Sequence, residues 1–417
     1  MTRIADTLGG IIAWLRTMRG TAGYTGPVSH WWESSLLFSG TMIDWRYEGI
    51  ICGFVNLFHS TNDEAYLTHA IEAAEDVVRS QLPSGRYLNS SFQFGAVDGG
   101  TPHEAAVDVG LLELARLLKA QRKPEWTRYF DVARRNIEGY LVGDLWKGHG
   151  FVDQDWNDTL VPNKNATAMR AMMLYGELAG KDVSRYLIPA ASVVLESQVR
   201  GTERSGGTVH SGTGHQQLAI SIYTARCTAE IEELYSIYPR EEYLEFIEAS
   251  VGFLSRLVGH KGVFFGFDRN SRLIYAPLWV AGGGDVLRAL LGARVITYVD
   301  PAVITSLVEM LTTNQCSGGG IRTSYGMARK GSLKPFRGAP DFRDVLPVVG
   351  WCDKAFRALT LLTEARQGRR EPVSIACLWR GCEAMYEEDD SEMKLSSATT
   401  TLYRYRKGES FPREFRL

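Results

Sequence analysis

Two pairs of acidic residues have the spacing of acid–base groups on neighbouring helices. Asp44 and Glu48 are four residues apart, as are Glu104 and Asp108, so each pair lies on one helical face. Glu104 follows Asp44, and Asp108 follows Glu48, by 60 residues. Two such carboxyl groups can cleave a glycosidic bond, because one protonates the leaving oxygen while the other activates water. These four are our candidate catalytic groups. Alternatively, they only stabilise helices as an N-cap or through the dipole.

A polar connection, residues 151–165, offers further candidates. Asp155 and Trp156 suit a sugar, since a carboxylate accepts hydroxyl hydrogen bonds while an indole covers the apolar face of the ring. The alternative is a turn held by Asx hydrogen bonds. Alternating Asp residues here resemble a calcium loop, but the required Gly and the final Glu are absent, so we expect no metal. Asn165 either caps the next helix or contacts substrate.

Aromatic residues and histidines gather in the long connections. Exposed aromatic clusters mark binding surfaces, although any single ring can equally be core. A histidine titrates near neutrality and could abstract a proton next to a carboxylate, with Tyr275 or Tyr325 as partner; a structural role is the alternative. The candidate substrate contacts of these kinds are Trp45, Tyr47, His103, His210, His215, Tyr275, Trp279, Tyr325 and Trp351.

Basic residues cluster in the longest connection, residues 315–350, and Arg322 is our candidate among them. They could hold a substrate carboxylate, sulfate or phosphate. A solvated basic loop, with Asp341 and Asp344 as internal partners, is the alternative. The Gly-rich segment 282–285 lacks the lysine and the strand context of a phosphate-binding loop.

Helical periodicity organises the chain that carries these residues. Apolar residues recur at i, i+3, i+4 and i+7 in twelve segments. The expected helices are 4–19, 44–59, 65–82, 104–120, 126–141, 166–178, 186–198, 217–235, 242–258, 286–296, 302–312 and 351–363. Short polar links follow every even helix, and long Gly- and aromatic-rich links follow every odd one.

A repeat runs through the long connections. Gln81, Gln198 and Gln315 each follow an apolar helix and precede glycine and a β-branched or aromatic residue, and successive glutamines are 117 residues apart. Related segments lie between them at 141–151 and 257–264. The unit is therefore half as long and holds two helices. Six such units can close into a ring, with all long connections at one end.

Residues 1–365 resemble the six-hairpin, (α/α)6 toroid superfamily in this rhythm and in the Gln…Gly…aromatic segments. Its members include glycoside hydrolases, unsaturated uronyl hydrolases, sugar epimerases and polysaccharide lyases. The resemblance implies an all-α (α/α)6 toroid of about twelve helices as the catalytic domain. Residues 366–417 would form a C-terminal appendage, with a short β-hairpin at 395–405. In the uronyl hydrolases, paired acids come from successive inner helices, and Asp44 and Glu104 match them by position.

Composition argues against nucleic-acid binding, membrane insertion, secretion and zinc binding. The formal net charge of -2 gives no basic surface for nucleic acid. No apolar stretch reaches the roughly 20 residues that span a bilayer, and no signal peptide is recognisable, so we expect a cytoplasmic protein. The six cysteines form no Cys-x-x-Cys pair, which indicates free thiols and no zinc. We expect no cofactor and leave the oligomeric state open.

We therefore expect a carbohydrate-active enzyme, first of all a glycoside hydrolase acting on an acidic or modified saccharide. A polysaccharide lyase or sugar epimerase using His and Tyr is the nearest alternative. An isoprenoid cyclase would instead show a deep apolar cavity with one acidic cluster. A non-catalytic binding ring would show acids neutralised by arginines.

Overall fold

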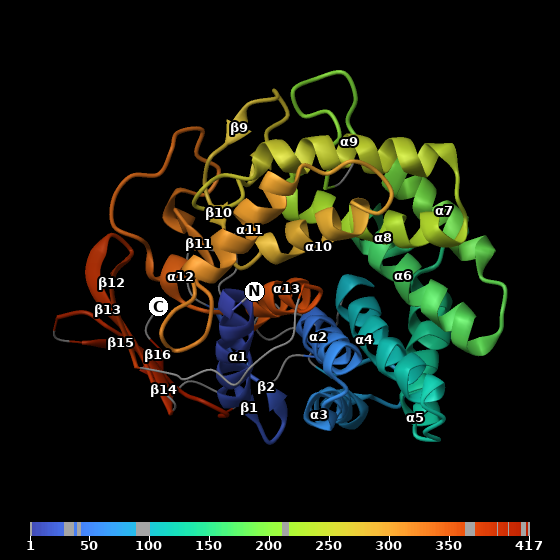
Figure 1. Ribbon diagram of the computed structural model, residues 1–417, viewed down its shortest axis with the longest axis horizontal. Helices are drawn as coiled ribbons and strands as arrows, with labels where there is room; N and C mark the ends of the chain where they lie inside the picture. Colours follow the sequence, from blue (N-terminus) through green and yellow to red (C-terminus); the bar gives the residue numbers. More distant parts are fainter. Residues whose placement is uncertain are drawn as a thin grey trace.

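The computed structural model describes residues 2–28, 37–39, 43–88, 101–210, 217–362, 372–389, 391–398, 400–409 and 414–415 (Figure 1). All twelve expected helices are present in these ranges. They are α1 (Thr2–Thr17), α2 (Trp45–Thr61), α3 (Glu64–Ser80), α4 (Thr101–Ala120), α5 (Trp126–Asn136), α6 (Pro162–Ala179), α7 (Ser184–Glu196), α8 (Ser221–Ile237), α9 (Glu241–Leu257), α10 (Gly283–Ala293), α11 (Pro301–Thr313) and α13 (Val349–Thr360).

Smaller helical elements complete this set. A π-helical segment, η1 (Ile137–Leu145), continues α5, and a 3-10 turn, η3 (Met327–Arg329), and a single turn, α12 (Phe342–Val345), lie in the last long connection. The helix expected from residue 217 begins four residues later, because Ala219 and Ile220 pair as a strand instead. None of the described helices is long and apolar enough to cross a membrane.

The helices form two concentric rings, which confirms the (α/α)6 toroid. Helices α2, α4, α6, α8, α10 and α13 each contact the next, and α13 packs on α2 to close the inner ring. Helices α1, α3, α5, α7, α9 and α11 lie outside them (Figure 1). The inner helix α2 is buried over most of its circumference, whereas α3 buries one face through Leu67, Ala70, Ala74 and Val77. Burial on one side is what an outer helix requires.

The Gln…Gly repeat fastens each long connection to the next outer helix. Gln81 Nε2 donates to the carbonyls of Gly85 and Val132, and Gln315 Nε2 donates to those of Gly319 and Thr7. Gln198 makes the same pair of bonds to Gly206 and Phe246. The three glycines share a φ near +90°, and a Cβ on any of them would strike a backbone carbonyl of that helix. Glycine is therefore required there by both conformation and space.

A second repeated contact joins the long connections to the inner helices. The residue that follows each tight turn donates its backbone N–H to one side chain on an inner helix. The pairs are Tyr24 with Tyr47, Tyr87 with Glu104, Phe151 with Asn165, Thr208 with Thr224, and Ile321 with Cys352. Five of the six inner helices thus use one position to satisfy a buried backbone donor.

The long connections contain short antiparallel strand pairs and all lead into inner helices. They are β1 (Arg19–Gly20) with β2 (Gly23–Tyr24), β3 (Gly26–Val28) with β4 (Leu37–Ser39), β5 (Val152–Gln154) with β6 (Asn157–Leu160), β7 (Ala219–Ile220) with β8 (Gly266–Phe267) and β9 (Leu273–Ile274), and β10 (Leu278–Trp279) with β11 (Ser324–Tyr325). The expected alternation of short and long connections is confirmed, and we call the end with the long ones the mouth.

The C-terminal segment forms a larger sheet than the expected hairpin. Five antiparallel strands follow one another: β12 (Val373–Trp379), β13 (Cys382–Glu388), β14 (Glu392–Ser396), β15 (Thr401–Arg406) and β16 (Glu414–Phe415). The hairpin expected at 395–405 is the β14–β15 pair. Buried Glu388 accepts a hydrogen bond from Trp14 Nε1 at 2.7 Å, so the sheet packs on α1. The domain boundary near residue 365 falls outside the described residues and stays a prediction.

Candidate functional site

Three aspartates from three inner helices gather at the mouth around one lysine. Asp44 is the N-cap of α2, Asp285 lies in the first turn of α10, and Asp353 lies in the second turn of α13 beside Lys354. Asp353 forms an ion pair with Lys354 and feels the charges of both other aspartates. Asp285 is partly exposed, whereas Asp44 and Asp353 are fully buried. We call these four residues the aspartate cluster.

Two carboxyl groups of the aspartate cluster, Asp353 and Asp285, have raised pKa values. Burial raises the pKa of Asp353 to about 7, with Asp285 and Asp44 adding to the rise and Lys354 opposing it. Burial also raises the pKa of Asp285, against the opposing charges of Lys354, Arg226 and Arg288. Carboxyl groups with raised pKa values at the end of a ring are candidate general acids.

Asp44 uses only one of its two carboxylate oxygens in hydrogen bonds with the described residues. Its Oδ1 accepts from the backbone N–H of Arg46 at 3.0 Å and from Arg46 Nε at 2.9 Å. Its Oδ2 is buried and has no hydrogen-bond partner among the described residues. A buried carboxylate oxygen without a donor is costly in a folded protein, and such sites are often functional.

Aromatic rings flank the aspartate cluster. The ring of Trp45, the first residue of α2, lies 5.7 Å from Lys354 Nζ and is partly exposed. Trp279 and Trp351 pack with ring centroids 4.9 Å apart, and both are buried. Trp45 is thus partly accessible, whereas Trp279 and Trp351 are packed inside.

Glu48, in the first turn of α2, belongs to a charged layer that links α2, α8, α10 and α13 inside the ring. Arg226 on α8 reaches both oxygens of Glu48, with Nη1 at 3.0 Å from Oε1, and Arg357 on α13 also pairs with it. Arg226 and Arg288 in turn pair with Glu230, at 3.6 and 3.0 Å. Burial alone would raise the pKa of Glu48, but Arg226 and Arg357 hold it well below its usual range. A carboxylate held ionised in this way is a poor proton donor.

Glu104 and Asp108 lie close together, and both form hydrogen bonds with buried neighbours inside the ring. Glu104 Oε2 accepts from the Tyr87 N–H at 3.3 Å and from Asn136 Nδ2 at 2.8 Å. Asp108 Oδ1 accepts from the Tyr87 hydroxyl at 2.7 Å, and burial raises its pKa well above its usual range. All three side chains are fully buried. In other helical hairpins of the ring, Asn165 and Tyr47 make the same contact with the backbone of a long connection. We therefore infer that Glu104 anchors the long connection before α4.

Other sequence candidates lie apart from the aspartate cluster. Asp155 and Trp156 form the exposed turn between β5 and β6, and Trp156 is 80% exposed. The β5–β6 hairpin thus offers an indole at the mouth. Asn165 is buried and bonds the Phe151 backbone, and Tyr47 is buried and accepts from Tyr24, so both hold the fold.

His210 stacks on Tyr223 with ring centroids 4.6 Å apart. Burial, with the charge of Lys164, lowers the pKa of His210 to about 4, so this imidazole is neutral at physiological pH. Its Nδ1 has no hydrogen-bond partner among the described residues. His215 and the side chain of His103 lie outside them.

Arg322 and Tyr325 in the last long connection, and Tyr275 in the connection before it, pack against neighbouring residues. The Arg322 guanidinium lies 3.7 Å from the Tyr325 ring centroid, and the Tyr325 hydroxyl donates to Asn314 Oδ1 at 2.7 Å. Tyr275 packs edge-on against Phe264 at 5.5 Å. These contacts account for Tyr325 and Tyr275 as parts of a packed connection, while Arg322 Nη2 is buried without a hydrogen-bond partner among the described residues.

Sequence reasoning missed Asp285, Asp353 and Lys354. The available signal was an acidic residue early in the fifth and sixth inner helices, in the latter next to a lysine. No group of three or more His, Cys, Asp or Glu side chains in the described ranges is arranged to hold a metal ion.

Comparisons with known proteins agree on the fold. No family model matches this sequence, and no curated protein matches it in sequence. The crystal structure of an unsaturated glucuronyl hydrolase specific for heparin is similar with a TM-score of 0.60 and 10% identity, covering 86% of this chain and 95% of that one. Cellobiose 2-epimerase from Bacillus thermoamylovorans B4167 is similar with a TM-score of 0.64 and 10% identity, over 87% of this chain and 100% of the other. A D-mannose isomerase gives a TM-score of 0.60 and 13% identity, over 87% and 98%. The chain therefore has the (α/α)6 toroid fold of these sugar-active enzymes.

Proposed function

We propose that this protein is a glycoside hydrolase that acts on an acidic or modified saccharide at the mouth of the ring. The observation that supports this proposal most is the aspartate cluster, in which three inner helices bring carboxyl groups to one lysine at the end where the long connections lie. Hydrolysis of a glycosidic bond requires a proton donor and a second carboxylate.

Asp285 is the proton donor in this scheme. It is the partly exposed member of the aspartate cluster, and burial raises its pKa, so it can hold a proton and deliver it to the leaving oxygen. Asp44 is the second carboxylate, and its uncommitted Oδ2 would activate water or stabilise the developing positive charge. Asp353 and Lys354 are positioning residues, which set the charge around Asp285.

A saccharide with an acidic group fits the cations at this end. Lys354 lies in the aspartate cluster. Arg322 lies in the last long connection, and its Nη2 has no hydrogen-bond partner among the described residues. Trp45 and the exposed Trp156 offer the ring faces that a pyranose packs against. One structural neighbour, by its name, acts on unsaturated glucuronyl units, which is the same kind of substrate. The free thiols of this chain agree with a reducing, cytoplasmic location.

The test is turnover on a panel of acidic and neutral oligosaccharides, including unsaturated uronides, with wild type and single variants. Asp285→Asn and Asp44→Asn should each lower kcat by about 100-fold or more, while thermal unfolding stays close to wild type. Glu242→Gln, an exposed carboxylate at the start of the outer helix α9, is the matched control and should keep full activity. Full activity in both aspartate variants would remove the mechanism.

A sugar epimerase or isomerase is the second candidate, favoured by His210. A neutral imidazole that stacks on Tyr223, and whose Nδ1 has no hydrogen-bond partner among the described residues, is suited to abstract a proton from carbon. Two structural neighbours are an epimerase and an isomerase. Turnover in deuterated water separates the two reactions, because proton abstraction leaves deuterium on sugar carbon and hydrolysis does not. His210→Gln should abolish an epimerase and leave hydrolysis largely intact.

A further inference from the structure

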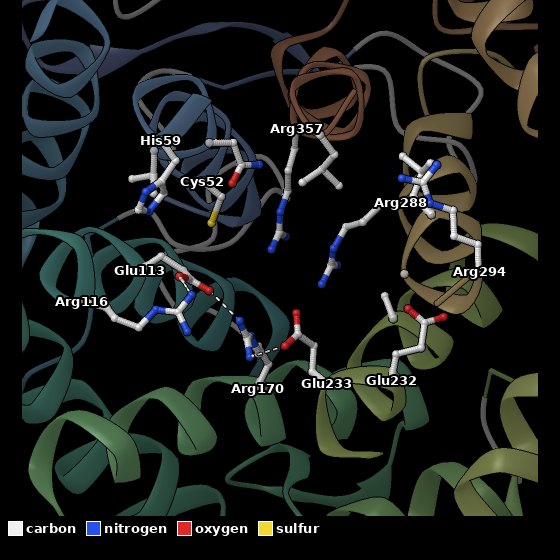
Figure 2. A pocket seen from close by; sticks show the side chains of 16 residues that line it. Cys52, His59, Glu113, Arg116, Arg170, Glu232, Glu233, Arg288, Arg294 and Arg357 are labelled. Atoms are coloured by element: carbon white, nitrogen blue, oxygen red, sulfur yellow. Dashed lines mark hydrogen bonds and ion pairs between the residues drawn. The ribbon is translucent and has the colours of Figure 1, made fainter. Parts of the chain in front are cut away.

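A second concave site lies at the end of the ring opposite the mouth. A cavity of about 410 Å³ is lined by residues from the middle and C-terminal parts of the six inner helices (Figure 2). This volume is within the range of small-molecule sites. We call it the arginine pocket, because five arginines line it: Arg116, Arg170, Arg288, Arg294 and Arg357.

The charged layer lies between the arginine pocket and the mouth. Its member Glu48 lies in the first turn of α2, Arg226 and Glu230 lie on α8, and all three are less than a tenth exposed. Arg288 and Arg357 belong to both, because each pairs with a layer carboxylate and also lines the pocket. The lining of the pocket shares no residue with the aspartate cluster.

The pocket arginines are only partly neutralised by their neighbours. Arg170 pairs with Glu113 at 2.6 Å and with Glu233 at 3.0 Å, and Arg116 shares the same Glu113 at 2.5 Å. Arg170 and Arg357 are close enough for the charge of one to disfavour the charge of the other. Two carboxylates on the lining thus serve several guanidinium groups.

Several guanidinium donors of the pocket have no hydrogen-bond partner among the described residues. Arg294 is exposed and has no ion pair or hydrogen bond in the described part of the chain, and Arg357 uses Nη1 alone. Arg288 gives both Nη atoms to Glu230 and keeps Nε. Figure 2 shows the side chains of Arg357 and Arg288 pointing into the same central space. Converging like charges of this kind favour an anion between them.

Glu232 makes the pocket more positive than its composition suggests. Its side chain lines the cavity and is 6% exposed, and its Oε1 has no hydrogen-bond partner among the described residues. Burial raises its pKa well above its usual range, so it favours the neutral, protonated form. A protonated carboxyl group can also donate a hydrogen bond to a ligand oxygen.

We propose that the arginine pocket binds a small molecule carrying a phosphate or sulfate group, with Arg294, Arg357 and Arg288 as donors. A tetrahedral oxyanion offers several acceptors, which matches donors that arrive from α10 and α13. The carboxylate oxygens of Glu113 and Glu233 on the lining can accept hydrogen bonds from ligand hydroxyls. A phosphorylated or sulfated sugar combines both features.

Isothermal titration calorimetry at fixed ionic strength tests this proposal, with inorganic phosphate, inorganic sulfate, glucose 6-phosphate and glucose as probes. We expect a Kd of about 1 mM or tighter for at least one anion and none for glucose. Tighter binding of glucose 6-phosphate than of phosphate would identify an ester as the ligand. Tighter binding of phosphate or sulfate would identify the free anion.

Single substitutions test whether the anion binds in the arginine pocket. Arg294→Ala should weaken it about tenfold, since that arginine lines the pocket and is exposed. Leu361→Glu, on the exposed rim of the pocket, should abolish it by adding a like charge. Arg269→Ala, an exposed arginine in the β8–β9 turn, is the matched control and should bind as wild type does. The proposal is overturned if no anion binds, if both pocket variants bind like wild type, or if chloride competes equally.

Discussion

The side-chain amide nitrogen of Gln315 lies 2.7 Å from the carbonyl oxygen of Thr7, so the last long connection holds the first helix of the chain. The same amide donates to Gly319 at 2.8 Å. Because α1 and α11 meet here, these two bonds help to close the outer ring, as the α13–α2 contact closes the inner one.

Replacing Gln315 tests this closure. Gln315→Leu leaves two backbone carbonyls without their donor and should lower the free energy of unfolding by about 1–3 kcal/mol. Urea unfolding followed by circular dichroism measures the change. Gln217→Leu, at an exposed position, is the control and should change it little. An equal effect in both variants would show that the bonds of Gln315 add nothing to stability.

Gly319 tests the space requirement of the same junction. Its φ is +94°, and a Cβ would lie 2.2 Å from the carbonyl oxygen of Gly10 on α1. Gly331 has a similar φ of +81° but open space around it. Gly331→Ala should therefore cost about 1 kcal/mol, from backbone strain alone. Gly319→Ala should cost well above that, and equal melting temperatures for the two variants would contradict the proposed close packing.

The periodic part of the fold was predictable because its signals are local. Apolar spacing within one helix, and a glutamine and a glycine within one turn, do not depend on distant residues. The aspartate cluster was not predictable from the sequence. It depends on ring closure, which brings Asp353 to Asp44 across more than 300 residues. The equivalence of the units was also misjudged. The offset of 60 paired Asp44 with Glu104, whereas the repeated backbone contact pairs Tyr47 with Glu104, since the units differ in length.

Asp353 should make stability depend on pH. Its pKa rises from an ordinary 3.8 to about 7 in the folded chain, so between these values the folded state keeps a proton that the unfolded state releases. Its contribution to stability is complete below about pH 4 and is lost as the pH rises through about 7. Asp353→Asn should remove a few kcal/mol of this dependence.

Unfolding free energies of wild type and Asp353→Asn, measured at several pH values between about 5 and 8, check this expectation. Asp131→Asn, on the exposed face of α5, provides the control. A variant curve parallel to that of wild type would show that Asp353 does not titrate in this range.

The same change should destabilise the fold far more at Glu48 than at Glu104. Glu48→Gln leaves Arg226 and Arg357 buried without their carboxylate, and should cost about 3–5 kcal/mol. Glu104→Gln keeps an oxygen that accepts from the Tyr87 N–H, and should cost about 1 kcal/mol or less. Because we assign both residues to the framework, Glu104→Gln should also retain turnover on any substrate that the panel reveals. Loss of turnover in a stably folded Glu104→Gln protein would instead place Glu104 in the reaction, and would move the proposed centre from α10 and α13 toward α4.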